Sequence, residues 1–234
     1  MRSRPCAYRS GMNFAPSSLP ATEPPLDCPR CPRLVDLRQQ MRAQHPDWWN
    51  APVPAFGDPQ AWLAIVGLAP GMKGANRTGR AFIGDGAGAL LYGTLAKFGL
   101  AHGTFTGSRE DDIALDGTII LNAVKCLPPG NAPTPKERDT CAPWLVREIA
   151  LTSPRVLVAL GGFAWQSVLR ALADLGEPVP SPRPKFGHGA TAQVGDRWLV
   201  GSYHPSQQNT FTGRLTKPML DDVLGRAMAL GAGS

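Results

Sequence analysis

Cysteine is the residue type whose placement in this chain most clearly suggests chemistry. The five cysteines stand at positions 6, 28, 31, 126 and 141. Cys28 and Cys31 form a C-x2-C pair, Cys126 ends an apolar run, and Cys141 lies on the helix expected next. If these elements converge, the four thiols can bind one zinc ion or one iron–sulfur cluster, and spacing does not separate the two. The other interpretation is a set of unrelated structural thiols. Cys6 is taken as a non-ligand.

Polar side chains follow two apolar runs. His204 stands near the end of RWLVGSYHPS, and Asn122 lies within TIILNAVKC. An imidazole N–H and a side-chain amide can both donate hydrogen bonds to a ligand. The structural alternatives are a histidine that caps a strand end and an asparagine that satisfies turn backbone.

The elements that must position these residues alternate in type from Ala61 onward. Four runs are too apolar to face water and are expected as strands, near 62–71, 118–126, 155–162 and 197–206. Helical spacing is found at 87–100, 135–151, 163–176 and 215–230. The alternation predicts an α/β single domain with a central four-stranded parallel sheet flanked by helices. Ligands of such sheets bind beyond the carboxyl ends of the strands, so GLAPG, NAVKC, ALGG and YHPS are expected to line the site.

Composition limits the classes of protein and of partner. No apolar run reaches the roughly 20 residues that span a bilayer, so no membrane partner is expected. Lys and Arg number 24 against 18 Asp and Glu, a net charge of +6. That excess suits a polyanionic partner, although many basic proteins bind none. Residues 1–27 are rich in Pro, Ser and Ala and are expected to form a disordered or loosely packed extension.

Three separated motifs carry a resemblance to a known family. GLAPGMKGANRTGRAFIGDGAG, NAVKC and SYHPSQQNTFTGRLT, together with the four cysteines, resemble the family-5 (B-type) uracil-DNA glycosylases. The resemblance covers the chain from about Cys28 to its end. It implies that residues 28–234 are a catalytic domain, a three-layer sandwich typical of uracil-DNA glycosylases. It also implies a 4Fe–4S cluster whose ligands are Cys28, Cys31, Cys126 and Cys141.

The activity implied by the resemblance is excision of uracil from double-stranded DNA, which leaves an abasic site. Such an enzyme must flip the base out of the duplex and must supply donors to the charge that builds on the leaving base. His204 is expected to donate to a base oxygen. The resemblance assigns Asn122 to the base pocket and Phe82 to stacking on the flipped base.

The first motif lacks an acidic or amide residue directly after its first glycine. Leu68 stands there, between Gly67 and Ala69, and the three are expected to contact substrate through their backbone. A leucine cannot accept a proton or orient a water, a lack that the resembled family shares. Asn76 and Asp85 are the polar candidates for positioning the attacking water, and Asp85 is as well suited to cap the following helix.

The loop after His204 is expected to contact DNA. Ser206, Asn209 and Arg214 are its candidate residues, although such a loop can also be simply solvated. Three basic side chains of the first motif are expected to add positive charge to the same rim: Lys73, Arg77 and Arg80.

Leu68 also bears on substrate range. Without a dedicated carboxylate, more of the catalysis depends on donors to a carbonyl oxygen that uracil, hypoxanthine and xanthine share. A broad glycosylase for deaminated bases is therefore expected. The protein is also expected to be monomeric and cytoplasmic, and to act on the nucleoid DNA of a bacterial cytosol. The alternative from another class is a non-catalytic iron–sulfur module that binds nucleic acid and releases no base.

Overall fold

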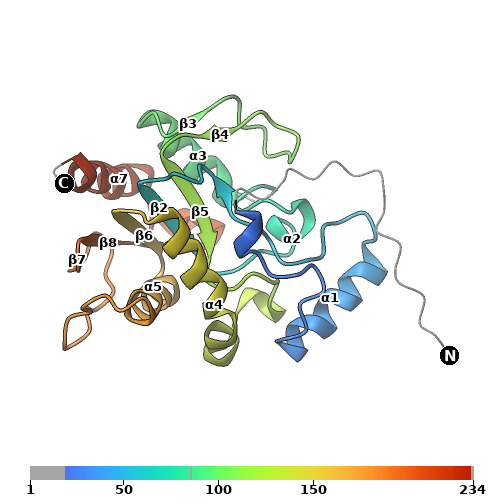
Figure 1. Ribbon diagram of the computed structural model, residues 1–234. Coiled ribbons are helices and arrows are strands. Elements are labelled where there is room, and N and C mark those ends of the chain that lie inside the picture. The colour runs from blue at the N-terminus through green and yellow to red at the C-terminus, as the bar shows by residue number, and fades with distance from the viewer. Residues whose placement is uncertain (1–18, 85, 233–234) are drawn as a thin grey trace.

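A six-stranded sheet forms the centre of the fold (Figure 1). The computed structural model describes residues 19–84 and 86–232. Four parallel strands lie side by side in the middle of the sheet, in the order β5 (Thr118–Asn122), β2 (Leu63–Gly67), β6 (Val156–Leu160) and β8 (Arg197–Ser202). The predicted α/β class and its four parallel strands are confirmed.

Two antiparallel edge strands were missed by the sequence analysis, which predicted a sheet of four strands. They are β1 (Phe56–Gly57) beside β5 and β7 (Thr191–Val194) beside β8. β1 has only two residues, and β7 alternates exposed and buried residues as an edge strand does. Neither has the fully apolar run on which the strand predictions rested.

Helices cover both faces of the sheet in three layers (Figure 1). α3 (Gly86–Lys97) and α7 (Lys217–Ala232) pack on one face, and α4 (Pro135–Thr152) and α5 (Gly162–Asp174) pack on the other. Successive side chains along a strand point to opposite faces of the sheet, so each strand contributes residues to both cores. In β2, Leu63 and Ile65 join the core under α3 and α7, whereas Ala64 and Val66 join the core under α4 and α5.

The remaining elements are short or peripheral. α1 lies outside the two helix layers that cover the sheet. The other elements are short helices and a small two-stranded hairpin. Their bounds are α1 (Pro32–Gln44), α2 (Ala75–Thr78), α6 (Gln207–Phe211), β3 (Ala101–His102), β4 (Ala114–Leu115), and the 3-10 helices η1 (Pro20–Thr22) and η2 (Pro129–Asn131). None of the helices in the described ranges is both long and apolar enough to cross a membrane.

The carboxyl ends of the parallel strands meet at one edge of the sheet, as predicted. Gly67 pairs with Asn122, and Leu160 pairs with Ser202. The loops after β2, β5, β6 and β8 therefore start beside one another. β5 ends at Asn122, so Cys126 lies in the loop toward α4. The sequence analysis placed Cys126 at the end of the strand, and that prediction was wrong.

The expected loose N-terminal extension is shorter than predicted. Leu19 is 2% exposed and belongs to the core under α4 and α5, and Glu23 accepts a hydrogen bond from the backbone N–H of Ala55 at 2.7 Å. Asp27 pairs with Arg42 on α1. Residues 19–27 are thus part of the folded domain, and composition missed this because their partners lie far along the chain. Residues 1–18, with Cys6, lie outside the described residues.

Candidate active site

A cavity of about 550 Å³ opens at the carboxyl ends of β2, β5 and β8. Its volume lies in the usual range for small-molecule pockets. The described residues that line it include six of the predicted site residues: Leu68, Ala69, Phe82, Asn122, His204 and Ser206. The structure therefore brings together residues that are up to 138 positions apart in the chain (Leu68 to Ser206).

His204 lies in the cavity wall, two residues beyond β8. Burial lowers the pKa of its imidazole from 6.5 to about 4, so the ring is neutral near pH 7 and carries a single N–H. Asn209 supports the backbone here, because its Nδ2 donates to the carbonyl oxygen of His204 at 2.8 Å. The site thus presents one neutral donor at this position.

Asn122 occupies the last position of β5 and is 3% exposed. Its amide nitrogen Nδ2 is buried and has no hydrogen-bond partner among the described residues. A buried donor without a partner is costly and rare in folded proteins. A ligand acceptor in the cavity would satisfy it. Gly67 makes room for this amide, since a Cβ there would come within 3.1 Å of Asn122 Oδ1.

Phe82 also lines the cavity. Its ring centroid lies 5.7 Å from that of His204, and its backbone has a φ of +58°. A bulky residue in the left-handed region is strained, and such strain is characteristic of functional sites. The ring edge also lies over Gly67, where a Cβ would come within 3.2 Å of Phe82 Cζ.

The water-positioning role was predicted for Asn76 or Asp85. The structure does not place Asn76 in the cavity lining. The amide of Asn76 is buried and donates from Nδ2 to Asn50 Oδ1 at 2.9 Å, so its role is structural. Asp85 lies outside the described residues. None of the described lining residues is acidic.

The predicted contact residues after His204 divide into two groups. Ser206 lines the cavity and caps α6, because its Oγ accepts a hydrogen bond from the backbone N–H of Asn209 at 3.4 Å. Asn209 and Arg214 are not part of the lining. Arg214 lies over the ring of Tyr203, with 4.7 Å from Cζ to the ring centroid. Both residues therefore support the cavity wall or its rim.

Four polar or flexible lining positions were missed by the sequence analysis: Gly130, Asn131, Gln207 and Gln208. The two glutamines directly follow the HPS motif, and that adjacency was a usable signal. Gln207 lies against the start of α3, since a Cβ on Gly86 would come within 2.5 Å of its Nε2. Gly130 and Asn131 gave no signal, because η2 reaches the cavity only through the fold.

The basic residues of the first motif do not share one environment. Lys73 and Arg77 are exposed, as expected for contacts with phosphates. Arg80 is 6% exposed and forms a buried ion pair with Asp111. The prediction that Arg80 adds charge to the rim was therefore wrong, because a residue in the loop between β3 and β4 neutralises it.

An exposed aromatic side chain lies on the short helix that follows the cavity. Phe211, the last residue of α6, is 84% exposed. Large apolar side chains at such exposure commonly mark an interaction site when they adjoin a ligand cavity. Phe211 lies four positions after Gln207, a lining residue.

The four candidate ligand cysteines line a second cavity, between α1 and α4. Burial raises the pKa of Cys126 to about 11 and that of Cys141 to about 12, so these thiols keep their protons unless a metal replaces them. Among the described residues, no three Cys, His, Asp or Glu side chains gather closely enough to chelate a single ion.

Hydrogen-bond donors face two of these sulfur atoms. Arg38 Nη1 lies 3.9 Å from Cys126 Sγ, and its Nη2 donates to the carbonyl oxygen of Cys28 at 3.0 Å. The backbone N–H of Lys125 points at Cys141 Sγ, 3.4 Å away. A buried cation and an N–H that both face sulfur suit thiolates. The donor set thus fits a sulfur-ligated metal centre.

The fold and the first cavity together define a class of protein: an α/β protein with a ligand-sized cavity at the carboxyl ends of its parallel strands. Family comparison supports a closer assignment, since the model of the uracil DNA glycosylase superfamily matches residues 54–226. The chain belongs to this superfamily of DNA glycosylases, and within it to the type-5 group, as its relatives show. The resemblance drawn from the three motifs is confirmed.

Similar proteins of the type-5 group are found in several organisms. The type-5 uracil-DNA glycosylase of Mycobacterium leprae is 48% identical over 214 residues, covering 87% of this chain and 91% of the relative. That of Mycobacterium tuberculosis is 46% identical over 213 residues, covering 87% and 78%. That of Thermus thermophilus is 43% identical over 210 residues, covering 87% and 93%.

Proposed function

We propose that the protein flips uracil out of double-stranded DNA into the first cavity and hydrolyses its N-glycosidic bond, leaving an abasic site. One observation carries the proposal. A neutral histidine, a buried amide without a partner and a strained aromatic ring converge on one cavity in a chain of this family. The names of the type-5 relatives supply the base, uracil.

Bond cleavage leaves negative charge on the base and positive character on the sugar. His204 donates its N–H to a base oxygen as that charge builds. A neutral imidazole can donate this hydrogen bond without placing a cation in the cavity, where burial of the charge would cost desolvation energy. The hydrogen bond is stronger in the transition state than in the bound substrate, so it lowers the barrier.

Asn122 and Phe82 hold the base for this step. The Asn122 amide pairs with polar atoms on the base edge, which satisfies its unpaired Nδ2. Phe82 stacks on the ring, and stacking tolerates any planar base. Together they orient the glycosidic bond and exclude water from the base.

The attacking water requires little activation once the sugar carries positive charge. No acidic residue is found among the described residues that line the cavity, so leaving-group stabilisation carries most of the catalysis. Polar groups of Gln207, Gln208 and Asn131 are available to orient a water. Asp85, next to Gly86 of the lining, is retained as a candidate for the same role.

We also propose that hypoxanthine and xanthine are substrates. The wall after β2 includes three small residues, Ala69, Gly71 and Ala75. With a volume of about 550 Å³, the cavity has room for a purine. His204 donates to a carbonyl oxygen that the three deaminated bases share, so it does not by itself distinguish among them.

We further propose that Cys28, Cys31, Cys126 and Cys141 bind a 4Fe–4S cluster. The four thiols line one cavity, and sulfur-only ligation suits either zinc or an iron–sulfur cluster. Membership of the type-5 group favours the cluster. A bound cluster would supply iron–sulfur bonds that link the segment before α1 to α4.

The proposed setting follows from these features. Duplex DNA is the partner, and the exposed Lys73, Arg77 and Arg214 are the proposed phosphate contacts. Free thiols that serve as metal ligands are typical of a reducing compartment, so we place the enzyme in the cytosol. We also propose that it acts as a monomer.

A panel of duplexes, each with one uracil, hypoxanthine or xanthine, tests the function. Single-turnover incubation should release free base and leave an alkali-labile abasic site, and His204→Ala should release far less. Binding of the duplex with no base released from any of the three would support a non-catalytic nucleic-acid-binding module. Release of uracil alone would contradict the broad range but not the glycosylase activity.

A further inference from the structure

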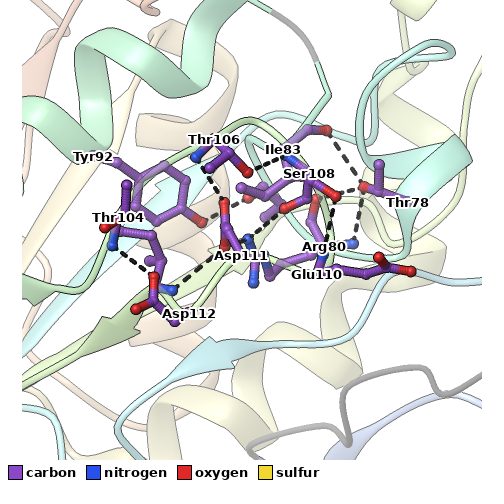
Figure 2. A network of polar contacts seen from close by, with 12 residues as sticks. Thr78, Arg80, Ile83, Tyr92, Thr104, Thr106, Ser108, Glu110, Asp111 and Asp112 are labelled. Atoms are coloured by element: carbon purple, nitrogen blue, oxygen red, sulfur yellow. Dashed lines mark hydrogen bonds and ion pairs between the residues drawn. The ribbon is translucent and has the colours of Figure 1, made fainter.

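Arg80 connects the loop that carries Phe82 to a second loop outside the cavity (Figure 2). Its guanidinium Nη2 pairs with Asp111 Oδ1 and donates to the carbonyl oxygen of Ser108 at 3.1 Å. The side chain of Arg80 is 6% exposed and that of Asp111 is fully buried. The guanidinium also lies over the ring of Phe56, 4.9 Å from its centroid. A buried pair of this kind fixes the geometry of both segments that it joins.

The second loop, residues 103–112 between β3 and β4, is shaped by its own hydrogen bonds. The backbone N–H of Thr106 donates to Asp111 Oδ2 at 3.4 Å, and the backbone N–H of Glu110 donates to Ser108 Oγ at 3.2 Å. The backbone N–H of Thr104 donates to Asp112 Oδ1 at 2.7 Å. The loop therefore holds Asp111 in place and directs its carboxylate at Arg80, as Figure 2 shows.

The segment on the other side of Arg80 carries the strained ring of the cavity. Phe82 has its φ of +58°, a conformation that persists only where the surroundings impose it. The phenol of Tyr92 donates to the carbonyl oxygen of Ala81 at 2.9 Å, and Thr78 Oγ1 lies 3.4 Å from the carbonyl oxygen of Ile83. A Cβ on Gly88 would overlap the carbonyl oxygen of Phe82.

The same second loop contacts one of these anchors directly. Phe105 stacks on Tyr92, with ring centroids 5.1 Å apart and an interplanar angle of 24°. Tyr92 in turn fixes Ala81, the neighbour of Phe82. The loop between β3 and β4 therefore acts on the Phe82 segment at two points, through Arg80 and through Tyr92.

We propose that Arg80 and Asp111 are positioning residues for base stacking. Their ion pair fixes the backbone before Phe82 so that the ring faces the flipped base. Neither residue lines the cavity or touches the reacting atoms. The inference rests on the proposed function and extends it to a loop that no motif of the sequence marks.

The test compares two non-reacting ligands with the reaction itself. A duplex with 2′-fluoro-deoxyuridine keeps its base, since the fluorine destabilises positive charge on the sugar, whereas an abasic duplex has no base to stack. Asp111→Ala should slow single-turnover uracil excision on the order of a hundredfold, the size expected from misplacing a bound group by about 1 Å. It should weaken binding of the fluorinated duplex and leave abasic-duplex affinity within about twofold, because phosphate contacts dominate the latter.

Glu110→Ala is the matched control, since Glu110 is a neighbouring acid in the same loop that is exposed and bonds within the loop through its backbone N–H, which the substitution keeps. It should match the wild type in all three measurements. Because Asp111→Ala leaves a buried cation unpaired, the double variant Arg80→Leu/Asp111→Leu and the conservative Arg80→Lys accompany it. A buried ion pair replaced by apolar residues usually leaves the fold intact.

The double variant should fold and show the same selective loss, and Arg80→Lys should show a smaller one. Wild-type excision by all of these variants would overturn the inference. Equal weakening of fluorinated and abasic duplexes would also overturn it, because a merely structural role affects both. If the wild type itself releases no base, the proposed function fails, while the ratio of the two affinities still reports on positioning.

Discussion

His204 faces the cavity as a neutral donor because protein surrounds its imidazole and lowers its pKa to about 4. Asn122 faces the same space with a buried, unpaired Nδ2. The unpaired Nδ2 costs stability in the free protein, and a bound base would relieve that cost. These two residues thus present hydrogen-bond donors that suit a polar ring with hydrogen-bond acceptors on its edge.

Removing the histidine should affect the chemical step and not DNA binding. We expect His204→Ala to lower the single-turnover excision rate on the order of a hundredfold or more, the usual cost of losing one transition-state donor. Affinity for abasic DNA should change far less, because phosphate contacts dominate it. Quench-flow assays and abasic-duplex titrations measure the two quantities. His102→Ala, an exposed histidine on β3, is the control, and equal losses in rate and affinity would show that His204 only shapes the site.

The lowered pKa of His204 also predicts a pH dependence of stability. The unfolded chain takes up a proton near the ordinary pKa of 6.5, whereas the folded chain takes it up only near 4. The contribution of His204 is therefore fully present above pH 6.5 and is lost as the pH falls from 6.5 toward 4. We expect His204→Gln to lose less unfolding free energy than the wild type between pH 7.5 and pH 5 in urea titrations. Parallel losses in the two proteins would contradict the shift.

Three helices carry residues of the two cavities outside the central sheet. α6 follows His204 and carries lining residues at its start and the exposed Phe211 at its end. α1 carries Arg38 to the sulfur cavity, and α4 carries Cys141 there. The substrate cavity thus depends on α6, and the cysteine cavity on α1 and α4.

Phe211 should assist base flipping by occupying the space that the base leaves in the duplex. We expect Phe211→Ala to reduce excision from paired duplexes more than excision from single strands, in which no stack must be opened. Leu151→Ala is the control, because Leu151 is an exposed apolar residue of α4 on another part of the surface. Equal effects on the two substrates would exclude a role in flipping.

Loss of one proposed cluster ligand should reduce stability more than chemistry. Cys28→Ala is expected to lower iron content and the thermal midpoint, because a cluster cross-links the segment before α1 to α4 and closes a long loop. Iron analysis and thermal unfolding measure both effects. Cys6→Ala, the cysteine taken as a non-ligand, should retain iron. Zinc without iron in the wild-type protein would refute the cluster.

The whole molecule carries a net charge of +6, and part of that charge is exposed near the cavity. Burial of Arg80 against Asp111 removes one cation from this rim. The charge that remains available for DNA is therefore smaller than the motif suggests, and it belongs to exposed residues such as Lys73 and Arg214.

Phosphate contacts should appear in the salt dependence of binding. We expect Lys73→Ala and Arg214→Ala each to reduce the slope of log affinity against log salt by about one, with the single-turnover rate at saturation nearly unchanged. Lys97→Ala is the control, because Lys97 ends α3 far from its cavity end and pairs with Asp221. An unchanged slope in both test variants would remove them from the DNA contact surface.

The sequence by itself determined the fold class and six of the residues that line the cavity. Four mainly apolar runs alternate with helical segments and therefore predict buried parallel strands, and the segments after such strands meet at one edge, so His204, Asn122 and Leu68 were predicted together. Local pattern is sufficient here because a parallel strand that is buried on both faces consists mainly of apolar residues.

Only the tertiary structure decided which polar side chains face the cavity. Asn76 and Arg80 stand in the same motif as Phe82, yet Asn50 binds the first and Asp111 the second, and both partners come from other segments. The packing of residues 19–27 and the edge strands β1 and β7 depend on distant contacts in the same way. A polar residue is compatible with either solvent or a buried partner, so its direction is set by whichever long-range partner the fold supplies.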